Sequence, residues 1–115
     1  MILGAGVKAY VCREPVDMRK SIDGLAQLVG PLLGADPLCG SLFVFLSRGR
    51  DKVKILWWDR HGFWLAYKRL ERGRFPSPEA LAAGALSSAE LLLWLEGVDL
   101  ARTRRLAAVA VSRVA

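Results

Sequence analysis

The chain has 115 residues, of which 53% are hydrophobic and 24% charged, a composition typical of one globular domain and untypical of a disordered protein. Its formal net charge of +6 favours an acidic partner, with nucleic acid ahead of a membrane surface. The chain contains no run of 18 or more apolar residues and its start lacks the pattern of a signal peptide, so we expect a cytoplasmic protein with no membrane partner.

The first predicted elements are a strand and a long helix. Apolar and other residues alternate over Val7–Arg13, as in a strand, and Pro15 ends the run. Asp17 is a suitable helix N-cap, and from Met18 apolar residues recur at offsets of four, seven, eleven and fourteen. This stripe predicts a helix that lies on the sheet and is ended or kinked at Gly30-Pro31, although its apolar pattern runs one turn further.

Two basic residues, Arg19 and Lys20, fall in the first turn of that predicted helix. The helix dipole already favours anions at this position, so the pair is a candidate anion-binding site. An ordinary solvated basic pair explains the two residues equally well.

A central strand and a β-hairpin follow in the sequence. Leu42–Leu46 is apolar on both faces, which predicts a strand covered on both sides. Two runs with a period of two residues, 53–57 and 63–67, flank Asp59-Arg60-His61-Gly62, which predicts a hairpin. An Asp first and a Gly fourth suit a type I turn closed by a glycine bulge.

That turn predicts which side chains face each other across the ribbon. Trp58 should lie opposite Trp64, and Lys54 opposite Lys68, on one side that also carries Lys52. The other side should be core and is made of Val53, Ile55, Trp57, Leu65 and Tyr67, with Arg69 opposite Val53. Like charges opposite each other cost stability, and a polyanion bound to the lysine side would neutralise them.

The hairpin and its flanks hold the surplus charge of the whole chain. Nine of the 17 basic residues and three of the 11 acidic residues lie in Arg48–Arg74, so this segment alone carries +6. The candidate DNA-binding residues are therefore Arg48, Arg50, Lys52, Lys54, Trp58, Arg60, Trp64, Lys68, Arg69, Arg72 and Arg74, together with Arg19 and Lys20. Alternatively, the two indoles are buried under the C-terminal helix and the surrounding cations bind phosphates without base stacking.

The last predicted element is a short helix. Ser87 and Glu90 fit a capping box, and the apolar run 91–95 predicts a largely buried helix that ends at Gly97. Residues 1–100 should form a single α+β domain, an antiparallel sheet of about four strands with one long helix packed on it and a short C-terminal helix, both on one face. Residues 101–115 should be a tail that is disordered or binds a partner.

The sequence offers no convincing catalytic or metal site. His61 is explained by the turn beside Asp59, and the two cysteines have no nearby histidine to complete a zinc site. The candidate carboxylates for a Mg²⁺-dependent nuclease each have a local explanation as a cap, turn or loop residue. We therefore expect no enzymatic activity, no metal and no cofactor, with a nuclease as the enzymatic alternative.

Four sequence strings together resemble a known bacterial family. They are D-M-R-K at Asp17–Lys20, L-F-V-F at Leu42–Phe45, K-x-L-W-W-D at Lys54–Asp59 and K-R-L-E-R-G-R-F at Lys68–Phe75. These strings, in a match spanning roughly residues 7 to 105, resemble the TnpB-type accessory protein, the second open reading frame of the insertion-sequence family numbered sixty-six. The chain departs from the family's pattern in lacking a tryptophan before Pro76 and in its Ala/Val-rich end.

The resemblance implies a part in transposition, beside a separate, larger transposase that carries the acidic catalytic residues. In that family the small protein has no established enzymatic activity. Combined with the basic hairpin, this leads us to expect an accessory protein that binds DNA, with the element ends and the transposase as partners. The alternative is an adaptor that binds the transposase without contacting DNA itself.

Overall fold

The computed structural model describes residues 6–81, 85–98 and 100, and these form an α+β fold built on one mixed sheet. The strand order is β4-β3-β2-β1-β5, in which β1–β2 is parallel and the other neighbouring pairs are antiparallel. The elements are β1 (Lys8–Val11), α1 (Ile22–Leu33), β2 (Leu42–Leu46), β3 (Lys52–Asp59), β4 (Gly62–Arg69), the 3₁₀ helix η1 (Pro78–Ala80), β5 (Leu86–Ser87) and α2 (Ser88–Leu95). The predicted fold class is confirmed, with β5 as an additional strand whose two residues are too few to show a period in the sequence.

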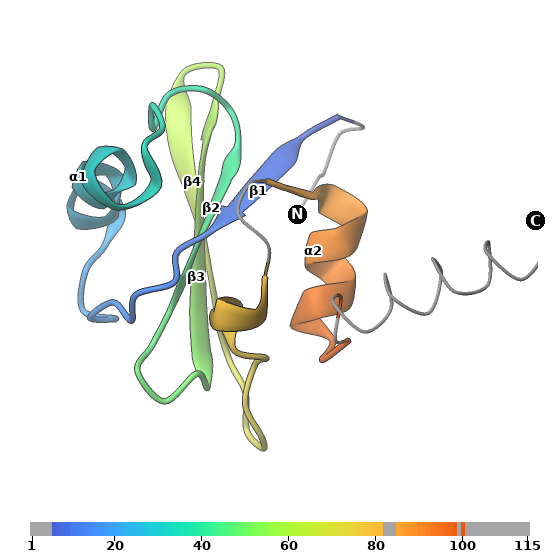
Figure 1. Ribbon diagram of the computed structural model, residues 1–115. Helices are drawn as coiled ribbons and strands as arrows, with labels where there is room; N and C mark the ends of the chain where they lie inside the picture. The colour runs from blue at the N-terminus through green and yellow to red at the C-terminus, as the bar shows by residue number, and fades with distance from the viewer. Residues whose placement is uncertain (1–5, 82–84, 99, 101–115) are drawn as a thin grey trace, which may run out of the picture.

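The two helices cover opposite faces of the sheet, so the expectation that both lie on one face was wrong (Figure 1). The parallel pair β1–β2 requires a crossover, and α1 lies in that crossover on one face. The helix α2 follows β5 at the far edge and packs on the other face, where Trp94 is buried. All five residues of β2 are buried, which confirms a strand covered on both sides.

The helix α1 begins later than the sequence predicts. Ser21 is its N-cap residue, and Asp17 instead caps a separate turn, because its Oδ1 accepts a hydrogen bond from the backbone N–H of Arg19 at 2.9 Å. Arg19 and Lys20 therefore precede the helix and do not belong to its first turn. The helix also continues through Pro31 and ends at Gly34, whose φ of 61° suits a glycine.

The hairpin β3–β4 is present, but its predicted register was wrong by one residue. Trp57 pairs with Trp64, Trp58 with Phe63, and Asp59 with Gly62. The chain reverses through two residues only, because Arg60 adopts a left-handed backbone with φ of 54°. Because neighbouring strand residues point to opposite faces, this slip moves the facing side chains of one strand to the other side of the sheet.

The predicted start of α2 is confirmed. The Ser87 Oγ accepts a hydrogen bond from the N–H of Glu90 at 3.1 Å, and the Glu90 carboxylate accepts one from the N–H of Ser87 at 3.1 Å. The helix is less buried than predicted, since Leu92 and Leu93 are about half exposed. The predicted tail, residues 101–115, lies outside the described residues. Within the described residues we find no helix long and apolar enough to cross a membrane.

A candidate nucleic-acid interface at the open end of the hairpin

Six cations gather at the end of the hairpin opposite its turn. The loop Ser47–Asp51 enters β3 there, and the segment Leu70–Phe75 leaves β4 beside it. Two backbone hydrogen bonds of 2.7 Å join the two segments, from the N–H of Leu70 to the carbonyl of Asp51 and from the N–H of Phe75 to the carbonyl of Arg50. We call this region the basic end, and its cations are Arg48, Arg50, Lys52, Arg69, Arg72 and Arg74.

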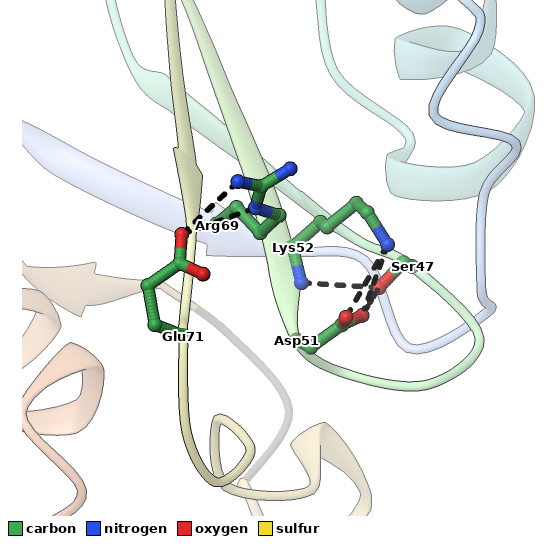
Figure 2. Close-up of polar contacts among 5 residues, drawn as sticks. All are labelled: Ser47, Asp51, Lys52, Arg69 and Glu71. Atoms are coloured by element: carbon green, nitrogen blue, oxygen red, sulfur yellow. Dashed lines mark hydrogen bonds and ion pairs between the residues drawn. The ribbon is translucent and has the colours of Figure 1, made fainter.

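Hydrogen bonds to one serine close the first of these loops (Figure 2). The hydroxyl of Ser47 donates to Asp51 Oδ1 at 3.1 Å and accepts from the N–H of Lys52 at 3.1 Å. The Lys52 Nζ lies 3.3 Å from Asp51 Oδ2. The hydrogen bonds from Ser47 and then from Lys52 hold the pKa of Asp51 below its ordinary value. Asp51 therefore stays ionised near neutral pH and keeps the loop closed.

The basic end keeps a positive excess despite two carboxylates. Arg69 forms an ion pair of 3.1 Å with Glu71, and both side chains are mostly exposed (Figure 2). An exposed pair of this kind contributes at most about 1 kcal/mol, so an anion competes readily for the guanidinium. Within the described part of the chain, the other four arginines of the basic end form no ion pair.

Lys54 is buried, which corrects its expected place on an exposed basic face. Its residue is 7% exposed, and its Nζ donates hydrogen bonds of 2.8 Å to the carbonyl oxygens of Met18 and Lys20. The Nζ also lies 4.7 Å from the ring centroid of Tyr67. Lys54 thus fixes the turn before α1 against β3 and is not available to a ligand.

This buried contact brings the segment with Arg19 and Lys20 beside the face of the sheet that carries Lys52 and Arg69 of the basic end. Lys52 and Lys54 are two residues apart in β3, so they share the face that α1 covers, and Arg69 pairs with Lys52 on that face. Arg19 makes a bidentate ion pair with Asp17, with a shortest distance of 2.7 Å, and lowers the pKa of Asp17 to about 2. We call Arg19, Lys20 and the six cations of the basic end the basic surface.

The remaining predicted residues do not join this surface. Arg60 is at the turn of the hairpin, about 23 Å from the start of β3 by the rise of a strand. Because of the register, Trp58 lies on the α1 face against Phe63, with ring centroids 5.0 Å apart. Trp64 stacks on Trp57 at 6.2 Å on the opposite face. The predicted face that combines both indoles with three lysines is therefore wrong.

The turn end has its own surface features. Trp64 is 57% exposed, and its Nε1 donates a hydrogen bond of 3.3 Å to Asp59. Trp57 and Trp64 line a hollow of about 740 Å³ together with Leu42 and other residues. Lys68 is exposed on the same face as these two indoles, toward the other end of β4.

A weak signal for the buried position of Lys54 is present in the sequence. This lysine stands between Val53 and Ile55 in the stretch 53–58, whose other residues are all apolar, a position where a charged side chain needs an internal partner. As for metal sites, the described residues contain no group of three or more His, Cys, Asp or Glu side chains that could hold an ion.

Comparison with known proteins finds a matching family model and relatives that match over most of their length. A family model described as IS66 Orf2 like protein matches residues 7–105. The uncharacterized protein y4jC of Sinorhizobium fredii (strain NBRC 101917 / NGR234) is 40% identical over 102 residues, which cover 87% of this chain and 86% of that protein. The uncharacterized protein y4hO of the same strain is 39% identical over 97 residues, which cover 84% of each chain. No solved structure matches the chain.

Proposed function

Because the chain belongs to the IS66 Orf2-like family, and is thus an accessory protein of an insertion sequence, we propose that it binds the element's DNA through its basic surface. The observation that carries this proposal is that hydrogen bonds join three separate segments that together bear eight cations, Leu70–Phe75 to Arg50 and Asp51, and the backbone of Lys20 to Lys54 in β3. Duplex DNA offers a dense row of phosphates, and releasing its counterions favours binding by such a surface.

The chemistry of the basic end suits phosphates better than bases. Five of its six cations are arginines, whose planar guanidinium can donate two parallel hydrogen bonds to one phosphate. Trp58 and Trp64 lie at the other end of the hairpin, so base stacking plays no part in this contact. We therefore infer that the protein positions itself on the DNA backbone with little sequence readout of its own. The larger transposase of the same element is the partner we expect to supply the catalytic residues.

The test compares two double charge reversals at opposite ends of the sheet. Arg72→Glu with Arg74→Glu changes two exposed arginines of the basic end. The control, Lys8→Glu with Arg60→Glu, makes the same change in net charge at the turn end, since the pairing of β1 through β4 places Lys8 there. Affinity is measured by fluorescence anisotropy with a labelled duplex from the element end.

We expect the reversal at the basic end to weaken binding about tenfold or more at low salt, because two phosphate contacts become repulsive. The control should bind nearly as tightly as the natural protein. Equal losses in both variants would show that only net charge matters, which would contradict a site at the basic end. Binding that appears only when the transposase is added would indicate the adaptor function instead, and cutting of the duplex in Mg²⁺ would indicate a nuclease.

A further inference from the structure

The strand β4 forms a long, regular edge of the sheet. Its eight residues pair with β3 without interruption, from Asp59↔Gly62 to Lys52↔Arg69, and contain no proline. The opposite edge, β5, has two residues and leads directly into α2. An edge as long as β4 presents a row of free backbone groups that another strand can pair with.

The register identifies which backbone groups of β4 point outward. The N–H of Leu70 donates to Asp51 across the hairpin, so this residue directs its backbone toward the β3 side. Backbone direction alternates along an antiparallel strand. The N–H and C=O groups of Phe63, Leu65 and Tyr67 therefore point away from β3, where no described strand pairs with them.

We propose that this edge pairs with β4 of a second copy of the chain, in antiparallel orientation, with Leu65 opposite Leu65 of the second copy. This arrangement uses the outward N–H and C=O groups of Phe63, Leu65 and Tyr67 in both copies. A two-fold axis perpendicular to the sheet keeps each face continuous across the interface, so the dimer has one ten-stranded sheet. The inference does not depend on the proposed function.

In this register the side chains of β4 in one copy fit those of β4 in the other copy. On one face the indole of Trp64 lies opposite the small side chain of Ala66 in the other copy, which leaves room for it. On the opposite face Phe63 lies opposite Tyr67, an aromatic cross-strand pair. Trp64 and Tyr67 are 57% and 55% exposed in the single chain, so pairing covers the two most exposed aromatic rings of the described residues.

The charges of the two copies also favour the register centred on Leu65 over one shifted by a residue. Lys68 of one copy lies opposite Gly62 of the other, and Asp59 lies beyond that glycine in the same row and on the same face. Since glycine has no side chain, the lysine can reach across it toward the carboxylate. A register centred on Ala66 instead places Lys68 opposite Trp64 and offers Asp59 no cation from the other copy.

The first test measures the mass of the full-length protein by sedimentation velocity over a range of concentrations. We expect the natural protein to shift from monomer to dimer with increasing concentration. Tyr67→Pro removes one outward N–H, which an edge strand tolerates, and should shift the protein to monomer. The matched control Tyr67→Thr loses the same ring but keeps the N–H, and should remain a dimer of lower affinity.

The second test needs no variant and therefore no assumption that a proline is tolerated. Amide hydrogen exchange is followed by NMR in concentrated and diluted samples of the natural protein. The amides of Phe63, Leu65 and Tyr67 should be protected when concentrated and exchange faster on dilution, whereas those of Trp64 and Ala66 stay protected in both. A protein that stays monomeric, or whose outward amides exchange rapidly at all concentrations, overturns the inference, as does a folded Tyr67→Pro that remains a dimer.

Discussion

The buried lysine Lys54 shows how one side chain organises the candidate interface. Its ammonium is a strong donor in a place with little water, so an apolar strand accepts it only because two carbonyl oxygens and an aromatic ring compensate for lost hydration. Those carbonyls belong to Met18 and Lys20, in the segment that precedes α1. The same contacts therefore stabilise the fold and hold Arg19 and Lys20 beside the basic end.

We predict that Lys54→Met destabilises the protein by about 1–3 kcal/mol, because two backbone carbonyls lose their partner in a poorly hydrated place. The matched control Lys52→Met removes a lysine whose side chain is 35% exposed, from the same face of the same strand, and should cost less than about 1 kcal/mol. Urea unfolding followed by tryptophan fluorescence measures both values. Similar unfolding midpoints for the two variants would show that the Lys54 contacts add little.

The ion pair between Asp17 and Arg19 makes a prediction about pH. The contacts from Arg19 lower the pKa of Asp17 from its ordinary value of 3.8 to about 2. A lowered pKa in the folded state means that the pair stabilises the turn above about pH 3.8 and that this contribution is lost as the pH falls through about 2.

Titration of the Asp17 carboxyl carbon by NMR should show a midpoint near pH 2 in the natural protein. In Arg19→Ala the midpoint should move up toward 3.8, since the first cause of the shift is the hydrogen bond from that guanidinium. The control Lys20→Ala should change it much less. An unchanged midpoint in Arg19→Ala would attribute the low pKa to another group.

At the level of elements, local patterns predicted the existence of strands and helices well. The apolar run Leu42–Leu46, the hairpin and the capping box of Ser87 and Glu90 all depend on neighbours in sequence, and all three are confirmed. The register of the hairpin and the face covered by each helix were predicted wrongly. The register depends on the backbone angle of Arg60, which is unusual for a non-glycine residue, and the faces depend on the β1–β2 crossover.

The two turn residues supply a test of this register. Arg60 has a φ of 54°, so Arg60→Gly should stabilise the hairpin by about 1 kcal/mol through relief of the left-handed penalty. His61 has no positive φ, so His61→Gly should destabilise by about 0.5–1 kcal/mol, because glycine adds only entropy to the unfolded chain. Thermal unfolding compares the two variants. Shifts of the same sign would contradict a turn in which Arg60 alone carries the unusual angle.

At the level of the whole molecule, the sequence located the surplus charge but not its arrangement. The sequence alone shows that nine of the 17 basic residues lie in Arg48–Arg74. Folding then separates them, since Lys54 is buried, Lys68 lies on the α2 face and Arg60 lies at the turn. Only long-range pairing shows this, together with the approach of Arg19 and Lys20. The basic surface thus combines a segment visible in the sequence with one that a buried contact brings to it.

The salt dependence of DNA affinity measures how many of these cations reach phosphates. If the four arginines without an ion pair, Arg48, Arg50, Arg72 and Arg74, do so, log K should fall with log salt at a slope of about −3.6, which is four times −0.9. Replacing Arg72 and Arg74 by alanine removes two of the four contacts and should reduce the slope to about −1.8. Alanine at Lys8 and Arg60 removes the same charge from the turn end and should leave the slope unchanged. An equal reduction in both variants would mean that DNA responds to the overall charge of the protein and not to the basic surface.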